Sequence, residues 1–320
     1  MTRGKDNIVR ILFLGGAKRV AMARLFSKAL EEKGYGCEIY GYELDTRCPL
    51  ASVGTVFKGL RWRDPKIFDD LTSICGRRNI DIVLPFVDPA VSIASELVFK
   101  YCPEVFSPVS EADAADKMFD KVAAADLFEQ LGLPVPTTYR GEAFTSNLIA
   151  KPRFGSASKG IIKIDCAADL EALDDTDAYL IQERIDNRRE YTVDCYVSRQ
   201  GRILAVSPRV REEVSGGEVV RTTTIDSPEA VSLVRKVLKA TELRGAVTVQ
   251  LIHDLDSDRL LVMEINPRLG GGCVASVYAG ADIPALIVEE ALGLNTAERL
   301  PRAGVVTTRY LADVVFYSEN

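Results

Sequence analysis

The sequence predicts an α/β domain built on an open parallel sheet, followed by a larger α+β region. Over the first hundred residues, strand-like apolar runs alternate with helical periodicity, which favours parallel strands joined by right-handed helical crossovers. Beyond residue 136, strand-like runs follow one another with few helices between them. The 320 residues are 47% apolar and 27% charged, which is typical of a globular protein of about two domains.

The first region opens with an apolar run over residues 8–14 that ends at Gly15-Gly16. A helix is predicted next, because apolar residues recur at helical spacing between positions 22 and 30 and Gly34 stands where a helix would end. The same criteria predict a strand at 37–42, a helix around 67–75 and a strand at 80–86.

The second region opens with a helix predicted from about 113 to 131. It ends at Gly132-Leu133-Pro134-Val135-Pro136, because proline cannot continue a helix. Strands are predicted at 147–152, 160–164, 179–183, 191–198, 203–207 and 219–225. A helix over 228–241 then precedes a hairpin that pairs strands 246–253 and 259–266.

Composition excludes several classes of protein. The net charge of −6, with no basic stripe, argues against nucleic acid as the main partner. Seven scattered cysteines without a C-x-x-C pair, and a single histidine, argue against a zinc site or a disulfide framework. No apolar stretch approaches the roughly 20 residues of a membrane span, and the first residues lack a secretory apolar segment. We therefore expect a cytoplasmic chain that acts on small molecules, with no membrane partner.

The Gly15-Gly16 turn lacks the three-glycine spacing of a dinucleotide site, which makes NAD binding there improbable. It is nevertheless expected near a substrate crevice, because ligands gather at the carboxyl ends of parallel strands. Asp88 ends another strand of this sheet, where it would either bind an amine or cap the next helix.

The predicted hairpin carries a candidate metal site. If its turn is centred on Ser257, Gln250 lies opposite Glu264, and Asn266 shares their face because strand side chains alternate. One carboxylate and two amide oxygens suit a hard cation such as Mg²⁺. The alternative is an ordinary amphipathic hairpin, with Val249, Leu251, Met263 and Ile265 on the apolar face. The continuation Pro267-Arg268-Leu269-Gly270-Gly271-Gly272 favours the metal site, because a cation and a glycine-rich backbone suit an anionic ligand.

A glycine- and serine-rich loop at residues 151–160 is the second cluster. It reads Lys151-Pro152-Arg153-Phe154-Gly155-Ser156-Ala157-Ser158-Lys159-Gly160, between two strands. Glycine lets backbone amides approach phosphate oxygens, while serine and lysine add donors and charge. The alternative is a flexible polar turn.

Taken in order, these clusters resemble the ATP-grasp ligases over nearly the whole chain. The pattern is nearest to the synthetase unit of carbamoyl-phosphate synthase and to small stand-alone amino-acid ligases. The resemblance rests on Asp116-Lys117, Phe128 to Pro136, Lys151-Pro152, Gln182-Glu183-Arg184-Ile185, Arg189 to Asp194, Gln250, Met263 to Arg268, and Gly271-Gly272. It implies a pre-ATP-grasp domain at residues 1–110 and an ATP-grasp domain at 111–320. The latter would divide into a small lobe at about 136–188 and a C-terminal lobe at about 189–320.

The resemblance also implies roles for individual residues. Lys117 and Lys151 would contact the ATP phosphates, under a lid that includes Gly155, Ser156, Ser158 and Gly160. The segment Gln182, Glu183 and Ile185 would face the adenine, and Glu190 would hold the ribose. Gln250, Glu264 and Asn266 would coordinate Mg²⁺, or alternatively Mn²⁺. Arg268, with Lys151, would stabilise the transferred phosphoryl group.

The resemblance implies a ligase that activates a carboxylate as an acyl phosphate and joins it to an amine, with amino acids as expected substrates and a homodimer as an expected assembly. Many relatives have a carboxylate at the first metal position. This chain has Gln250 there, and the carbamoyl-phosphate synthase type likewise has glutamine. One alternative is therefore phosphorylation of bicarbonate or carbamate with a partner protein. The single catalytic unit argues against complete carbamoyl-phosphate synthesis. A second alternative is an ATP-binding sensor without catalytic activity. Arg209, Arg211 and Arg221 would either bind a substrate carboxylate or form a solvated charged hairpin.

Overall fold

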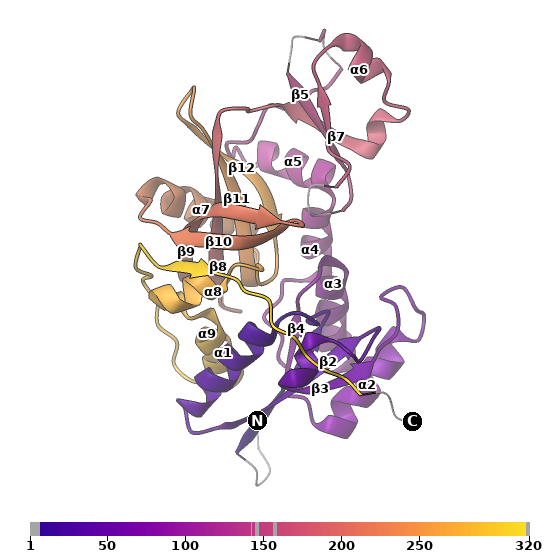
Figure 1. Ribbon diagram of the computed structural model, residues 1–320, viewed down its shortest axis with the longest axis vertical. Coiled ribbons are helices and arrows are strands. Elements are labelled where there is room, and N and C mark those ends of the chain that lie inside the picture. The colour runs from indigo at the N-terminus through magenta and orange to yellow at the C-terminus, as the bar shows by residue number, and fades with distance from the viewer. Residues whose placement is uncertain (1–6, 142, 145–146, 156–158, 318–320) are drawn as a thin grey trace.

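The computed structural model describes residues 7–141, 143–144, 147–155 and 159–317. Three separate sheets organise the described chain (Figure 1). A parallel sheet holds the N-terminal region, a six-stranded antiparallel sheet occupies the middle of the molecule, and a small three-stranded sheet lies at the opposite end. The predicted combination of an open α/β domain with an α+β region is confirmed.

The N-terminal sheet has four parallel strands in the order β3-β2-β1-β4. Its strands are β1 (Ile8–Leu14), β2 (Gly36–Glu43), β3 (Thr55–Lys58) and β4 (Ile82–Pro85). Its helices are α1 (Val20–Glu31), α2 (Ile67–Arg78) and α3 (Asp88–Glu96), with the 3₁₀ turn η1 (Pro49–Ser52) and the π turn η2 (Leu97–Tyr101). Sequence patterns missed β3, a four-residue edge strand with no fully buried side chain and therefore a weak hydrophobic signal.

The single helix predicted over residues 113–131 is wrong, because two helices occupy this segment. The first is α4 (Ala112–Phe119) and the second is α5 (Lys121–Gln130). Asp120 between them has extended dihedral angles, φ −89° and ψ 102°, and its carboxylate accepts hydrogen bonds from the backbone N–H groups of Val122 and Ala123. An N-cap of this kind starts a new helix, and it places Lys121 at the first helical position.

The small sheet has the antiparallel order β6-β5-β7, with β5 (Leu148–Pro152), β6 (Ile162–Ile164) and β7 (Tyr179–Glu183). Between β6 and β7 lie α6 (Ala167–Glu171) and the 3₁₀ turn η3 (Thr176–Ala178). This lobe has its own apolar core, built around Leu148, Ala150, Ile164 and Ile181.

The six-stranded sheet has the order β12-β11-β8-β9-β10-β13, and every neighbouring pair is antiparallel. Its strands are β8 (Arg188–Val197), β9 (Ile203–Ser215), β10 (Glu218–Thr224), β11 (Gly245–Asp254), β12 (Arg259–Asn266) and β13 (Val306–Thr308). Its helices are α7 (Pro228–Thr241), the short α8 (Val274–Ser276), the π turn η4 (Val277–Ala281) and α9 (Ile283–Ala291). None of the described helices has the length and apolarity that a membrane span requires.

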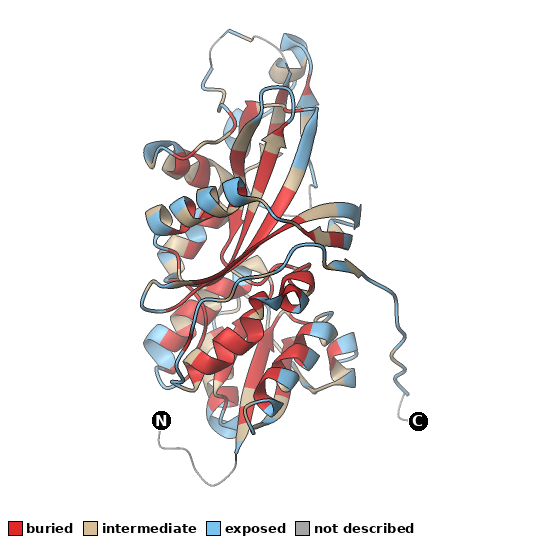
Figure 2. Ribbon diagram, turned by 90° about the vertical axis from the view of Figure 1, so that its left-hand side faces the viewer, coloured by how far each residue is buried: buried red, intermediate tan, exposed pale blue. Residues whose placement is uncertain are grey.

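One apolar core crosses from the parallel-sheet domain into the large lobe. Helix α1 packs against α9, and Phe13 and Phe26 belong to the same buried cluster as Tyr196 and Leu286. Figure 2 shows buried residues on both sides of this boundary. The N-terminal sheet is therefore held firmly against the large lobe, and its carboxyl edge can form one wall of a shared site.

A second junction between these regions predicts a specific loss of stability. Gly245 has φ +78°, and a Cβ atom there would lie 1.8 Å from the carbonyl oxygen of Pro108, which accepts a hydrogen bond from the Ala246 N–H. Gly245→Ala should therefore lower the free energy of unfolding by roughly 2–4 kcal/mol, since it adds backbone strain to a steric clash. Chemical denaturation measures the difference.

The control is Gly76→Ala in α2, where an added Cβ meets nothing within 4 Å. That change should leave stability unaltered or raise it by up to about 1 kcal/mol, because alanine is the better helix former. Equal effects of the two variants would contradict the close packing of Gly245 on Pro108.

Candidate functional site

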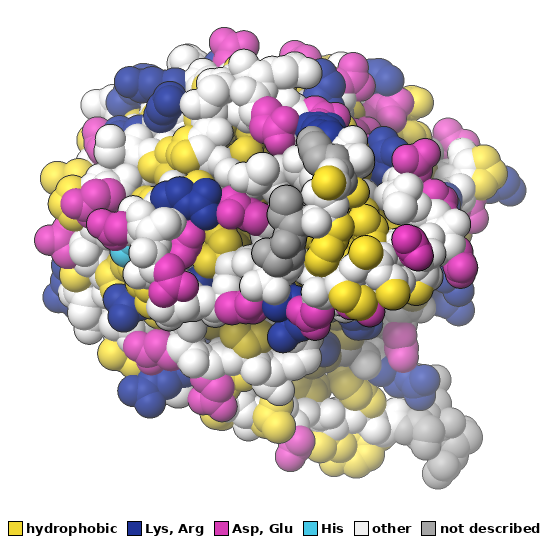
Figure 3. Space-filling model, turned by 90° about the horizontal axis from the view of Figure 1, so that it is seen from above, with side chains coloured by type: hydrophobic (Ala, Val, Ile, Leu, Met, Phe, Trp, Pro, Cys, Tyr) yellow, Lys and Arg dark blue, Asp and Glu magenta, His cyan; other side chains and the backbone are white. Residues whose placement is uncertain are grey.

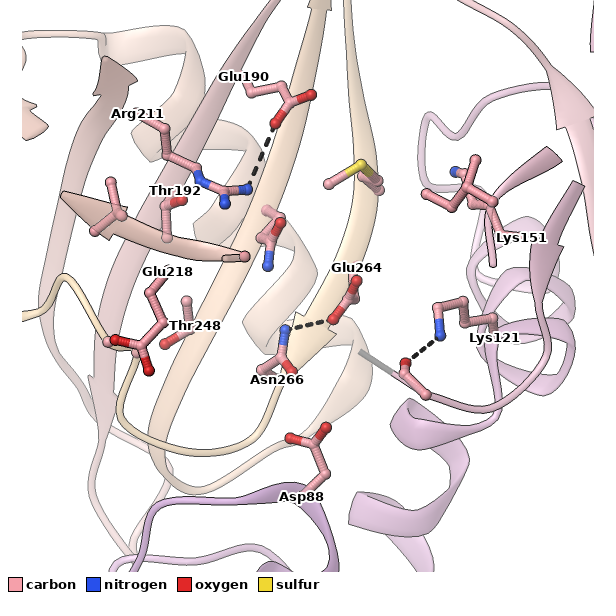
Figure 4. A pocket seen from close by; sticks show the side chains of 18 of the residues that line it. Asp88, Lys121, Lys151, Glu190, Thr192, Arg211, Glu218, Thr248, Glu264 and Asn266 are labelled. Carbon is pink, nitrogen blue, oxygen red and sulfur yellow. Dashed lines mark hydrogen bonds and ion pairs between the residues drawn. The ribbon is translucent and has the colours of Figure 1, made fainter. Parts of the chain in front are cut away.

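A pocket of about 500 Å³ lies where the three sheets meet (Figure 4). The parallel-sheet domain contributes Arg19, which precedes α1, and Asp88, which begins α3. The small lobe contributes Lys151 from β5, and Lys121 comes from the start of α5. The large lobe contributes residues of β8, β9, β11 and β12, followed by Arg268 and Gly270 to Gly272.

The pocket concentrates positive charge in a chain whose net charge is −6. Its lining residues include nine basic and five acidic side chains. The basic ones are Arg19, Lys121, Lys151, Lys159, Arg184, Arg188, Arg209, Arg211 and Arg268, and the acidic ones are Asp88, Glu183, Glu190, Glu218 and Glu264. On the outer face in Figure 3, by contrast, basic and acidic side chains are interspersed. An excess of cations in a cavity favours an anionic ligand.

The hairpin β11–β12 brings the predicted metal-ligand set together. Gln250 pairs with Glu264, as predicted, and Asn266 lies two residues further along the same strand. The pairing depends on a β-bulge beside Gln250, because Leu251 pairs with Val262 and leaves Met263 without a direct partner.

The bulge also overturns the prediction that Met263 faces the apolar core. Met263 lines the pocket, on the side of Glu264, because a bulge interrupts the strict alternation of side chains. Val249, Leu251 and Ile265 are buried in the core of the large lobe, as predicted. Met263 instead packs with Ile185, Ile252 and Leu261, and so gives the pocket an apolar surface.

A chain of hydrogen bonds runs from the metal-ligand set to the N-terminal domain. The Asn266 Nδ2 donates to Glu264 Oε1 at 2.7 Å, and Arg268 donates through a terminal nitrogen to Asn266 Oδ1 at 3.1 Å. The Arg268 Nε donates to Asp88 Oδ1 at 2.5 Å. Val87 occupies the N-cap position of α3 and Asp88 is its first helical residue, so the alternative that Asp88 caps this helix is wrong. Figure 4 shows Asp88, Asn266 and Glu264 along one side of the pocket.

Two lysines approach the pocket from the side of the small lobe. The Lys151 Nζ donates to Gln182 Oε1 at 3.0 Å. Burial lowers the pKa of Lys151 to about 8, and nearby Lys121 and Arg188 act in the same direction, while Glu264 opposes them. The Lys121 Nζ donates to the carbonyl oxygen of Gly155 at 2.6 Å.

The structure does not bring Lys117 to this pocket. Lys117 is exposed on α4, one helical turn before Asp120, whereas Lys121 lines the pocket. The sequence contains two Asp-Lys pairs four residues apart, Asp116-Lys117 and Asp120-Lys121. Only the second stands at the start of a new helix, beside the glycine loop.

Most remaining predicted residues lie at or beside the pocket. Gln182 is buried behind Lys151 and donates from Nε2 to the Pro136 carbonyl oxygen. Glu183 and Ile185 line the pocket, although the Glu183 carboxylate is held by Arg259 at 2.9 Å. Glu190 lines it and accepts hydrogen bonds from Arg188 and Arg211.

The glycine loop is represented in the pocket by Gly155, Lys159 and Ile161, and Gly160 stands between the last two. Ser156 and Ser158 lie outside the described residues.

The three arginines singled out in the sequence have three different environments. Arg209 is only 3% exposed, and its Nε donates to Asp194 Oδ2 at 2.7 Å, so it is a buried structural ion pair as well as part of the pocket wall. Arg211 pairs with Glu190 at 3.5 Å. Arg221 is exposed and pairs with Glu212.

Sequence patterns missed Arg19, Lys121, Met263 and Glu218 as pocket residues. Lys121 was detectable through its Asp-Lys pair. Arg19 follows the Gly15-Gly16 turn that was expected near a crevice, but the identity of the contributing side chain was not predicted. Glu218 carried no such signal.

Comparisons with known proteins agree with this geometry. Residues 175–314 match the family described as ATP-grasp in the biosynthetic pathway with Ter operon. Biotin carboxylase from Campylobacter jejuni superposes with a TM-score of 0.72 at 16% identity, over 94% of this chain and 75% of that one. N5-carboxyaminoimidazole synthetase from Staphylococcus aureus, complexed with ADP, gives 0.70 at 18% identity, over 92% and 80%.

L-amino acid ligase from Bacillus licheniformis gives a TM-score of 0.67 at 16% identity, over 94% of this chain and 76% of that one. No curated protein sequence matches significantly. The chain therefore has the ATP-grasp fold. Residues 175–314 are in addition similar in sequence to the ATP-grasp family associated with the Ter operon.

The buried pair beneath the pocket generates a stability prediction. Asp194 is 1% exposed and is also bound by the Ser276 hydroxyl at 2.7 Å, so Arg209→Ala would leave a buried carboxylate without its counter-charge. The free energy of unfolding should fall by roughly 3–5 kcal/mol. Arg221→Ala, at an exposed pair, should cost less than about 1 kcal/mol. Denaturant titration of both variants measures this, and equal costs would show that the Arg209 pair is not structural.

Proposed function

We propose that this chain is an ATP-dependent ligase that activates a carboxylate as an acyl phosphate and joins it to an amine. The observation that carries the proposal is the hydrogen-bonded series Glu264, Asn266 and Arg268, which shares one pocket with Lys121 and Lys151. A carboxylate beside amide oxygens, an arginine and two lysines supplies what phosphoryl transfer needs, namely positioned cations around the migrating group.

In this proposal ATP lies across the pocket, with its adenine and its phosphates in different parts of it. Met263, Ile185 and Ile252 provide an apolar surface suited to the adenine ring, and Glu190 offers carboxylate oxygens to the ribose hydroxyls. Lys121 and Lys151 are placed for the phosphates. We assign the phosphate role that the resemblance gave to Lys117 to Lys121 instead.

Gln250, Glu264 and Asn266 form the proposed site for Mg²⁺, with Mn²⁺ as the alternative metal. Their oxygen atoms are ligands that a hard cation prefers, and a single carboxylate leaves positions for phosphate oxygens. The bound metal would neutralise charge on the phosphates. Among the described residues, no group of three or more acidic, cysteine or histidine side chains is arranged to hold a metal ion.

The proposed reaction has two steps. An oxygen of the substrate carboxylate attacks the γ-phosphorus, the bond to the bridging oxygen breaks, and ADP leaves. The amine lone pair then attacks the acyl carbon, the C–O bond to phosphate breaks, and phosphate leaves as the nitrogen loses a proton. Arg268 is the residue that would stabilise negative charge on the phosphoryl group, and Asp88 holds its guanidinium in place.

We also propose the division into a domain at 1–110 and an ATP-grasp unit at 111–320, with lobes at about 136–188 and 189–320, acting on small molecules in the cytoplasm as a homodimer. The second candidate function is phosphorylation of bicarbonate or carbamate. Gln250 at the first metal position favours it, and one similar fold, a 2-oxoglutarate carboxylase domain, is described in complex with MgADP and bicarbonate.

The ligase proposal predicts metal-dependent release of ADP. ATP with Mg²⁺ should raise the melting temperature, because a ligand at 100 times its Kd adds about 2.7 kcal/mol, and NADH should not. ADP should be released on addition of amino acids or bicarbonate. Glu264→Gln should keep the fold and reduce ADP release by about a hundredfold or more, because it removes the carboxylate of the metal set.

The matched control is Glu171→Gln on the exposed surface of α6. Both variants are assayed for melting temperature and ADP release. If the protein binds ATP but none of these conditions leads to ADP release, the sensor alternative is favoured. Full turnover by Glu264→Gln would contradict the proposed metal site.

The two Asp-Lys pairs allow a paired test of the phosphate site. Lys121→Ala should weaken ATP binding roughly tenfold or more, because it removes a cation from a cavity that holds the phosphates. Lys117→Ala removes an equal charge from the exposed surface of α4 and should change the Kd less than about twofold. Calorimetric titration of the two variants with ATP and Mg²⁺ distinguishes them. A larger loss in Lys117→Ala would return the phosphate role to that residue.

A further inference from the structure

Arg19 stands at the end of the pocket that is lined by Gly270 to Gly272. It precedes α1 and makes no capping hydrogen bond with its side chain, which extends to the glycine run that follows Arg268. A Cβ atom added to Gly271 would lie 3.4 Å from a terminal nitrogen of Arg19 and 3.3 Å from one of Arg309. Two guanidinium groups therefore converge on one stretch of backbone.

Within the described chain, the Arg19 guanidinium has no side-chain partner at hydrogen-bond distance. Its ion-pair partner there is Glu218 at 3.7 Å, which is longer than a hydrogen bond. Glu218 is bound more closely by Arg309, which also donates to the Gly271 carbonyl oxygen. Burial lowers the pKa of Arg19, and Arg309 and Arg268 act in the same direction, while Glu218 opposes them. A half-buried guanidinium with a poorly matched partner is a suitable anion-binding group.

The turn before Arg19 is built to hold it in place. The Arg19 N–H donates to the Gly16 carbonyl oxygen at 2.8 Å, which closes the turn just before α1. Gly15 has φ +70°, and a Cβ atom there would meet Val87 at 2.5 Å, so the turn requires glycine. A side chain on a rigid turn loses little entropy when it binds a ligand.

We propose that Arg19 binds a carboxylate of the amine-bearing substrate, which makes that substrate an amino acid rather than ammonia. The assignment rests on the proposed ligase function and extends it. Lys121 and Lys151 approach the pocket from the side of the small lobe, whereas Arg19 belongs to the parallel-sheet domain. We therefore assign to Arg19 a second carboxylate, distinct from the one that is phosphorylated.

This end of the pocket is positively charged. Arg19 and Arg309 face the single carboxylate of Glu218, Lys18 lies close enough to lower the pKa of Glu218, and Arg268 lies close enough to lower that of Arg19. Such an end suits an anion, and the planar guanidinium of Arg19 can hold both oxygens of a carboxylate.

The test compares amino acids with their amides, which keep the amine but lack the carboxylate. Each of the common L-amino acids and its amide is added at millimolar concentration to the full chain with Mg²⁺ and a non-hydrolysable ATP analogue, and the melting temperature is measured. In a second assay, ATP replaces the analogue and the same compounds are added in pairs. The rate of ADP release then gives KM and kcat. The variants are Arg19→Ala, Arg19→Lys and the control Arg24→Ala, an exposed arginine on the same helix.

At least one amino acid should stabilise the wild type and drive ADP release, and its amide should do so much less. Arg19→Ala should raise the KM for that amino acid roughly tenfold to a hundredfold, with a smaller change in kcat, because a charge-assisted bidentate contact is lost. Lysine should rescue only part of the loss. Arg24→Ala should behave as the wild type. Stabilisation of Arg19→Ala by the ATP analogue shows that it is folded, and Arg19→Lys tests the same site if alanine is not tolerated.

Three results would overturn the assignment: amides as effective as acids, an unchanged KM in Arg19→Ala, or a wild type that responds to no amino acid. ADP release with bicarbonate or ammonia alone would then leave the ligase proposal standing without Arg19. Absence of any stabilisation by the ATP analogue would instead overturn the proposed function, and the assignment of Arg19 falls with it.

Discussion

The ion pair between Arg268 and Asp88 is the interaction on which the arrangement of the site depends. Its two residues belong to different sheets, and the 2.5 Å contact joins the carboxyl edge of the parallel sheet to the end of β12. Through Asn266 the same guanidinium is connected to Glu264, so the proposed metal-ligand set and the N-terminal domain are linked. Because α1 and α9 share a core, the distance between these walls is held by apolar packing.

The balance of charge in the pocket explains several of its features. Cations that face one another in a cavity repel, and here three of them have an acidic or amide neighbour. Arg268 has Asp88, Arg209 has Asp194, and Lys151 has the amide oxygen of Gln182. Burial lowers the pKa of Lys151, and the positive charges of Lys121 and Arg188 act in the same direction. A bound polyanion would supply the missing negative charge.

The small lobe makes fewer contacts with the large lobe than the N-terminal domain does. Its main polar link is Arg259, which binds both Glu183 at the end of β7 and Asp254 at the end of β11. The link lies at the segment that leads from β7 into β8, beside the apolar surface of Met263 and Ile185. Anything that binds against this segment therefore contacts both lobes, so its binding energy contributes to their relative position.

The sequence by itself determined the fold class, most of the strands and the hairpin that places Gln250 opposite Glu264, because hydrophobic periodicity and turn residues act locally. It also identified the lysine before the glycine loop and the arginine after the hairpin. Tertiary structure decided the rest. The N-cap at Asp120 starts a new helix and so places Lys121, and not Lys117, in the pocket wall. A β-bulge directs Met263 toward the pocket. Arg209 forms a buried ion pair with Asp194 and is therefore a structural residue. Arg19 and Glu218 lie almost 200 positions apart, and only the packing of two domains brings them to one wall. Such contacts depend on long-range packing, which local sequence patterns do not encode.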